Sequence, residues 1–188
     1  MTDERTLEDK VQYLLDRQEI ADVIAQHARG HDRHDVELLT ATYHDDGIDE
    51  HGHAINAGTS YAEWANATHR TSSSSHLHNV TTHSCEIDGD TAHAESYVMV
   101  VLLSPDETST SIMNGRYVDR LERRDGAWRL AVRRATVDAV ATGDATMLRH
   151  PFFREQGYIR GTRDRTDVSY QRPLSLDGPE PVRWRTDV

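Results

Sequence analysis

The chain has 188 residues, and its 21 Lys and Arg against 32 Asp and Glu give a formal net charge of −11. This length predicts one domain with a tail. No segment approaches the roughly 18 consecutive apolar residues of a membrane span, and the negative charge disfavours nucleic acid and anionic lipid as partners. The N-terminus lacks the pattern of a secretory signal, and the single cysteine, Cys85, permits no intrachain disulfide, so we expect a cytoplasmic location.

The N-terminal part of the sequence predicts helices. Residues 7–29 predict a long helix that stops at Gly30, and residues 35–39 predict a short one capped by Asp32 or Asp35. The apolar stripe expected on the first helix consists of Val11, Leu14, Ala21, Ile24 and Ala28, with Asp16, Arg17, Glu19 and Asp22 facing water. The polar segment 43–56 then suits a short strand that enters a loop.

After a third predicted helix at residues 61–70, with Trp64 buried, β patterns dominate the sequence. Four predicted strands are joined in pairs by turns that contain Asp-Gly, and they span residues 78–87, 91–103, 112–123 and 127–137. Helices followed by a run of long antiparallel strands predict an α+β fold, in which the helices pack on one face of a curved sheet. We assign this domain to residues 1–140.

Residues 141–188 form a different kind of segment. They hold four of the five prolines and little continuous apolar sequence, which predicts an irregular C-terminal extension. Disorder is the alternative. Its aromatic residues favour an extension that packs on its own subunit or on a partner's, and they are Phe152, Phe153, Tyr158, Tyr170 and Trp184.

Four segments in a characteristic order resemble the SnoaL-like branch of the nuclear transport factor 2 superfamily. They read DRQEIADVIAQHARGHDRHD, YHDDG, HNVTTHSCEIDGDTAHAESY and GRYVDRLERRDGAWRLAVRRATVD, and they span about residues 10–140. The resemblance implies a cone-shaped α+β barrel, with N-terminal helices over a strongly bent, mostly antiparallel sheet and a deep pocket inside. The superfamily includes scytalone dehydratase, bile acid dehydratases, hexachlorocyclohexane dehydrochlorinase, steroid isomerases, polyketide cyclases and proteins without chemistry, so fold alone does not decide function.

The resemblance implies a catalytic His–Asp dyad. It places Asp32 on the dyad carboxylate and His78 on the dyad histidine, where a neutral imidazole takes a proton and the carboxylate holds its tautomer. Asp32 as a helix cap and His78 as a solvent-facing strand residue are the alternatives. His76 and His83 compete with His78; His76 shares its strand face, whereas His83 has the opposite parity in an unbroken strand.

Arg133 falls on a pocket arginine of the dehydrochlorinase, five residues after Trp128. Such a cation would bind a leaving group or an oxyanion. Strand alternation allows only one of Arg133 and Arg134 to point inward. Two surface arginines are the alternative.

His27 and His31 lie four residues apart near the implied pocket mouth, where either is a candidate general acid. His31 stands where the scytalone dehydratase pattern has a tyrosine, so the identity of that reaction cannot be carried across. The other candidates for substrate contacts, each with core packing as the alternative, are Tyr43, Tyr97, Tyr117 and Trp64.

Two His-x-His pairs raise the question of a metal. Alternate strand residues share a face, so His51 with His53, or His76 with His78, can bind one ion. The cupin pattern fails, because no glutamate follows either pair at the required spacing. We therefore expect no metal and no cofactor, and we expect Cys85 to be a packed residue.

These observations favour a cofactor-independent lyase, of the dehydratase or dehydrohalogenase type, acting on a small hydrophobic, cyclic substrate in an enclosed pocket. An isomerase or cyclase with the same base, or a ligand-binding protein without chemistry, is the alternative. We also expect a homodimer or homotrimer, because the open face of such a sheet is apolar.

Overall fold

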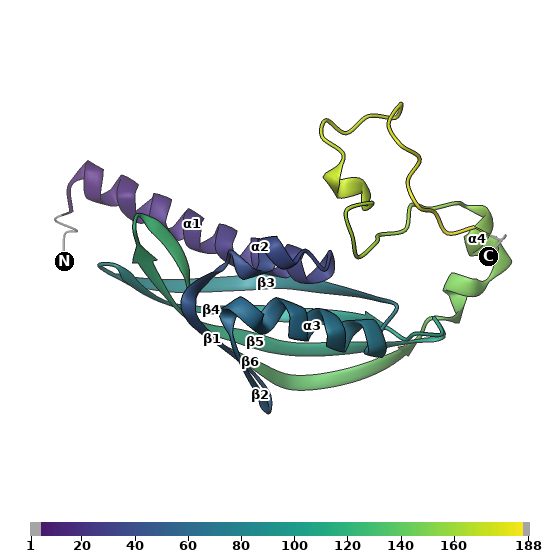
Figure 1. The fold of residues 1–188 in the computed structure, drawn as a ribbon, viewed down its shortest axis with the longest axis horizontal. Helices are drawn as coiled ribbons and strands as arrows, with labels where there is room; N and C mark the ends of the chain where they lie inside the picture. The colour runs from purple at the N-terminus through teal and green to yellow at the C-terminus, as the bar shows by residue number, and fades with distance from the viewer. Residues whose placement is uncertain (1–4, 186–188) are drawn as a thin grey trace.

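The computed structural model describes residues 5–185, and in this part of the chain six strands form one open, bent sheet with helices on one face (Figure 1). The strand order is β2-β1-β6-β5-β4-β3. The strands are β1 (Tyr43–His51), β2 (Ala54–Ala57), β3 (Ser75–Asp88), β4 (Thr91–Leu103), β5 (Ser109–Arg124) and β6 (Ala127–Asp144). Neighbours are antiparallel except for β1 and β6, which run parallel. The predicted α+β class is confirmed, and β2 and β3 are the sheet's two edges.

Segment 43–56 is more regular than the single short strand expected from its polar sequence. β1 spans nine residues and turns back into β2 through Gly52, whose φ of +66° favours glycine. His51 and His53 therefore lie on either side of a turn and not on one strand face. Pairing with β6 overrides the weak local preference for strand.

Three helices cover the sheet: α1 (Leu7–Asp32), α2 (Val36–Thr40) and α3 (Gly58–Ser72). α1 does not stop at Gly30, as we predicted, but continues to Asp32. A Cβ at Gly30 would lie 2.9 Å from the backbone nitrogen of Leu39, so this glycine allows α2 to pack closely on α1. Asp35 is the cap of α2, because its carboxylate accepts the Leu38 N–H at 3.1 Å.

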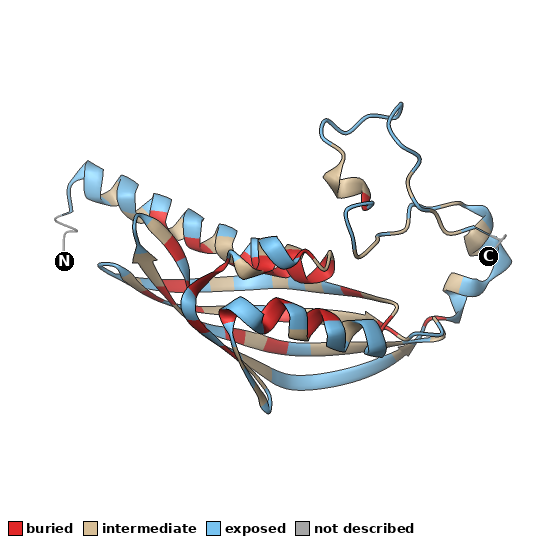
Figure 2. Ribbon diagram, viewed as in Figure 1, coloured by how far each residue is buried: buried red, intermediate tan, exposed pale blue. Residues whose placement is uncertain are grey.

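The buried face of α1 also differs from the predicted stripe. Val11 and Leu14 are exposed, because the first turns of α1 lie outside the core (Figure 2). Asp16, predicted to face water, is buried. It accepts hydrogen bonds from Trp128 Nε1 at 3.0 Å and from Arg123 Nη1 at 2.7 Å, which satisfy the carboxylate.

The hydrophobic core lies where α1, α2 and α3 meet the concave face of the sheet, and Figure 2 shows the buried segments gathered there. Trp64 is only partly buried and packs against this core. Cys85 is buried in it, as expected of a packed residue. The largest apolar members are Ile20, Ile24, Leu39, Tyr43, Tyr61, Leu121, Trp128 and Leu130.

In the described part of the C-terminal segment, up to residue 185, there are three short helical elements, which are η1 (Thr146–Arg149), α4 (Pro151–Glu155) and η2 (Val168–Tyr170). β6 continues to Asp144, so regular structure extends into residues 141–188, which we predicted to be irregular. Polar contacts hold this segment to the helices, whereas Phe152 and Tyr158 are mostly exposed. Among residues 5–185, no helix is long and apolar enough to cross a membrane.

Candidate functional site

The structure brings His78 and Asp32 into direct contact. His78 Nδ1 lies 2.7 Å from Asp32 Oδ1, and the backbone N–H of His78 donates to both carboxylate oxygens at 3.1 Å. Only 4% of the His78 side chain and 12% of the Asp32 side chain are exposed. The last turn of α1 supplies the carboxylate and the start of β3 supplies the imidazole. Because a carboxylate only accepts hydrogen bonds, the imidazole proton of His78 lies on Nδ1 and the ring lone pair lies on Nε2.

A histidine cluster, which we define as His31, His69, His76 and His78, surrounds this contact. The ring centroids of His31 and His78 are 4.5 Å apart, and those of His69 and His76 are 4.1 Å apart. Burial lowers the pKa of His69 and of His76 to about 3, helped by neighbouring histidines. Burial also lowers the pKa of His31 well below its usual range. These three imidazoles are therefore uncharged at neutral pH.

The predicted residue His31 links the cluster to a second layer of buried polar groups. Its Nε2 lies 2.7 Å from the Tyr61 hydroxyl, which lies 3.3 Å from His51 Nδ1. Burial raises the pKa of Tyr61 well above its usual value, and the Asp49 carboxylate adds to this shift. Tyr61 is thus a neutral hydroxyl that can donate to either histidine.

His27 and Tyr43, two further candidates, are buried in this same interior. His27 Nε2 lies 3.0 Å from the Tyr43 hydroxyl, and that hydroxyl donates to Asp49 Oδ2 at 2.6 Å. Burial, followed by the Asp49 carboxylate, raises the pKa of Tyr43. Both residues therefore serve an internal network and have no direct contact with the His78–Asp32 pair.

Of the two neighbouring arginines, Arg133 points inward. It is fully buried and binds Asp119 through two hydrogen bonds of 2.8 and 2.7 Å, while its guanidinium lies 4.0 Å from the ring centroid of Tyr117. Its Nη1 is buried without a partner. Arg134 is exposed and pairs with Glu50 at 2.6 Å. Asp119 already neutralises Arg133, which limits its ability to bind a free anion.

A β-bulge in β3 changes the parity argument about the three histidines. Val80 pairs with Val98 and His83 pairs with Ser96, so three steps along β3 oppose two along β4. The extra residue returns His83 to the inner face that His76 and His78 share. His83 Nδ1 lies 2.9 Å from the buried Ser96 Oγ, far along the strand from the pair. The opposite parity expected of His83 in an unbroken strand therefore does not apply to this bulged one.

Two candidates for substrate contacts lie away from the pair. Tyr97 lies between the buried Ser96 and Val98 and is 50% exposed, so alternation puts it on the outer face of the sheet. Trp64 contacts the rings of Tyr61 and His51 at the edge of the interior. The prediction that Tyr97 contacts the substrate is wrong, because only every second residue of β4 faces the interior.

Sequence reasoning missed His69, Asp49 and Asp119. The partly buried His69 follows the buried Tyr61 and Ala65 of α3 at a spacing of four residues, and this helical spacing is a signal that could have identified it. Asp119 could have been found from its alternation with Tyr117 on β5.

An open hollow of about 380 Å³ adjoins the pair between α1 and β3. A larger one of about 690 Å³ lies between α2 and the C-terminal segment and does not reach the pair. The smaller hollow has an apolar wall and two arginines at its rim, and it is lined by Asp32, His78, Ala25, Ala28, Val80, Arg29 and Arg33. A small molecule in it would contact both members of the pair.

Comparisons with known proteins identify a family and a fold. The sequence profile of the SnoaL-like domain matches residues 12–134. A structure of a protein of unknown function from Mycobacterium tuberculosis is similar, with 27% identity, a TM-score of 0.60, and coverage of 68% of this chain and 74% of that one. A search of curated protein sequences finds no significant match.

Two similar structures have names that refer to elimination chemistry. A putative scytalone dehydratase from Novosphingobium aromaticivorans has 17% identity and a TM-score of 0.64, over 70% of this chain and 90% of that one. A type 2 hexachlorocyclohexane dehydrochlorinase has 19% identity and a TM-score of 0.66, over 71% and 93%. At these levels of sequence identity, the similarity establishes a shared fold only.

Proposed function

The chain belongs to the SnoaL-like family, and on this premise we propose that it is a cofactor-independent lyase of the dehydratase or dehydrohalogenase type. The observation that carries the proposal is the 2.7 Å contact between His78 Nδ1 and Asp32 Oδ1 in a nearly buried setting. A histidine oriented by a carboxylate is a general base, and this base lines a hollow large enough for a small molecule. The substrate class is a small hydrophobic, cyclic alcohol or halide.

In the proposed reaction His78 removes a proton from carbon through Nε2. The electron pair of the broken C–H bond forms the new double bond, and the leaving group departs with the pair of its own bond. Asp32 holds the proton on Nδ1 and stabilises the imidazolium that forms. The carboxylate stabilises the imidazolium strongly because the pair is shielded from water. In bulk water the same electrostatic attraction would be weak.

His31 is the residue best placed to help the leaving group depart. Its ring lies 4.5 Å from that of His78, and its Nδ1 is buried without a partner. When the Tyr61 hydroxyl donates a hydrogen bond to His31 Nε2, the proton of this neutral imidazole lies on Nδ1, and the Nδ1–H can donate a hydrogen bond to a departing oxygen or halide, which leaves with the electron pair of its bond. Arg133 lies in the buried interior, where Asp119 neutralises its charge.

The experiment is turnover of a panel of cyclic alcohols and halides, with products identified by mass. We expect His78→Gln to lower the rate by 10²-fold or more, and Asp32→Asn to lower it by a similar factor. The matched control is His83→Gln, which removes an inward-facing histidine of the same strand that does not touch the pair.

Two outcomes would contradict the proposal. Undiminished turnover by folded His78→Gln would remove His78 from the reaction. A product of unchanged mass would indicate an isomerase, because a lyase loses water or a hydrogen halide from its substrate.

A further inference from the structure

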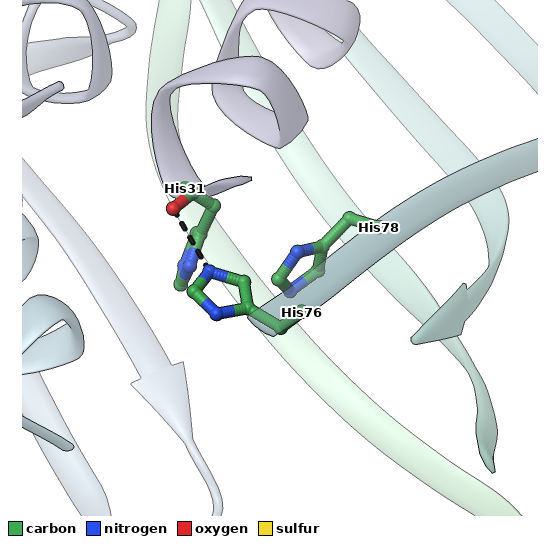
Figure 3. Close-up of side chains that lie close together, drawn as sticks. All are labelled: His31, His76 and His78. Carbon is green, nitrogen blue, oxygen red and sulfur yellow. Dashed lines mark hydrogen bonds between the residues drawn. The ribbon is translucent and has the colours of Figure 1, made fainter. Parts of the chain in front are cut away.

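We infer that His31, His76 and His78 form a binding site for one divalent transition-metal ion, with Zn²⁺ as the best match. One ring nitrogen from each residue lies within 4.8 Å of the others. Figure 3 shows the three rings side by side, one from the end of α1 and two from β3. Zinc–nitrogen bonds of about 2.0–2.1 Å require ligand atoms roughly 3.4 Å apart, so small rotations of the rings would close the site.

Hydrogen bonding fixes a free lone pair on two of the three imidazoles. His76 Nε2 lies 2.9 Å from the backbone carbonyl oxygen of His31. A carbonyl oxygen only accepts, so Nε2 carries the proton and Nδ1 carries a lone pair, and that Nδ1 is buried without a partner. In His78 the Asp32 carboxylate holds the proton on Nδ1, so the lone pair is on Nε2.

The third imidazole, His31, can present a lone pair as well. Tyr61 can donate its hydroxyl proton to His51 Nδ1, at 3.3 Å, and then accept the Nε2–H of His31 at 2.7 Å. His31 Nδ1, which is buried and unpaired, then carries a lone pair. Without a cation, the two buried nitrogens, His31 Nδ1 and His76 Nδ1, leave their acceptor capacity unused, which is costly.

In each imidazole, the ring nitrogen that would not bind the metal has a hydrogen-bond partner of the kind usual for metal-binding histidines. These partners are the Asp32 carboxylate for His78, a backbone carbonyl for His76 and the Tyr61 hydroxyl for His31. Such groups orient the ring and raise the affinity of the inner nitrogen for a metal. Three imidazole nitrogens favour Zn²⁺, Co²⁺, Ni²⁺ or Cu²⁺ over Mg²⁺ and Ca²⁺, which prefer oxygen.

This site departs from the expectation of no metal. That expectation weighed ligands along single strands, and the third ligand here comes from the end of a helix. The inference also bears on the proposed lyase, because the metal would use the same His78 Nε2 lone pair as the base. The metal-bound form and the proton-abstracting form therefore exclude each other, although metal binding can be measured without any substrate.

The test is titration of chelator-treated protein with Co²⁺, followed by visible absorption, and then competition with Zn²⁺. We expect one Co²⁺ per chain with an imidazole-type spectrum, and displacement by Zn²⁺. His76→Gln should weaken binding at least tenfold, because its amide can still donate to the His31 carbonyl but supplies no imidazole lone pair. The control is His93→Gln, which removes an exposed histidine of β4 and should leave the affinity unchanged.

Far-UV circular dichroism establishes that each variant is folded. If His76→Gln does not fold, His78→Gln replaces it in the experiment. This second variant also removes one ligand, and it is compared with the same control. Absence of a one-to-one Co²⁺ complex in the wild-type protein would overturn the inference. Equal affinity in the folded variant and in His93→Gln would overturn it too, because the bound ion would then lie elsewhere.

Discussion

Arg133 and Asp119 form an ion pair in which both side chains have no exposure to solvent. Burial alone would lower the pKa of Arg133, but the Asp119 carboxylate outweighs it and raises the pKa overall, so the guanidinium stays charged. The attraction is strong because the surroundings are poorly polarisable, yet both charges have lost their hydration. Such a pair contributes little net stability while it is intact and costs much when one partner is removed.

We predict that Asp119→Asn destabilises the fold by about 3–5 kcal/mol, because it leaves a buried guanidinium without its counter-charge. The measurement is urea unfolding followed by circular dichroism. Arg134→Ala is the control, since it removes an exposed pair with Glu50 and should change the unfolding free energy far less. Equal effects of the two variants would mean that Arg133 is hydrated in solution.

At the scale of elements, the C-terminal segment is joined to the helices through carboxylates. The Tyr170 hydroxyl donates to Asp35 at 2.6 Å, and Arg165 lies 3.3 Å from the same side chain. Burial would raise the pKa of Asp35, but the bonds from Tyr170 and from the Leu38 N–H, with the charge of Arg165, lower it overall. Asp167 behaves alike: burial is outweighed by hydrogen bonds from Ser169 and Thr162.

The lowered pKa of Asp35, whose partners include Tyr170 and Arg165 of the C-terminal segment, predicts that this segment detaches in acid. A lowered pKa in the docked state means that docking is fully stabilised above the undocked value of about 3.9 and weakens as pH falls through the docked values. Hydrogen exchange of residues 160–172, corrected for the intrinsic rate at each pH, should therefore increase below about pH 4. Unchanged protection there would exclude this role for the carboxylates.

The same docking can be tested at neutral pH. Asp35→Asn keeps a good helix cap but removes the charge, so we expect about tenfold faster exchange in residues 160–172. The matched control is Glu37→Gln, which removes an exposed carboxylate 3.5 Å from the same Arg165. Equal exchange in both variants would mean that Asp35 does not hold the segment.

At the scale of the whole molecule, the helices cover one face of the sheet and leave the other open (Figure 1). Tyr97 and Val118 are exposed on that outer face, on neighbouring strands and two register positions apart. Charged residues adjoin them, including Arg116, which pairs with Glu95 at 3.1 Å. Apolar side chains bordered by ion pairs are typical of a contact between copies of a chain.

We predict a homodimer or homotrimer that uses this face. Light scattering after gel filtration should give two or three times the monomer mass, and Val118→Glu should lower it to the monomer mass because association would bury an uncompensated carboxylate in the apolar contact. Val36→Glu, a change at an exposed position of α2 away from the sheet's outer face, should have no effect. A wild-type protein of monomer mass would refute the prediction.

The histidine cluster marks the limit of what the sequence could predict about the site. Family resemblance and spacing were sufficient to pair Asp32 with His78 and to identify Arg133 as a candidate, but they left the choice between Arg133 and Arg134 open. They did not identify His69, which lies on a third element, α3, although its helical spacing from Tyr61 and Ala65 was a usable signal. The face of His83 stayed open, because its parity could be derived only for an unbroken strand and no local sequence pattern predicts the bulge that adds one residue to β3.

The sequence by itself determined the α+β class, the order of helices and long strands, and the hairpins at Asp-Gly turns. These features depend on local periodicity and turn chemistry, which neighbouring residues encode. Only the tertiary structure decided that β1 pairs in parallel with β6, that Asp16 is buried, and that Gly30 continues a helix instead of ending it. Each of these depends on a partner distant in sequence, whose hydrogen bonds or close packing outweigh the local preference.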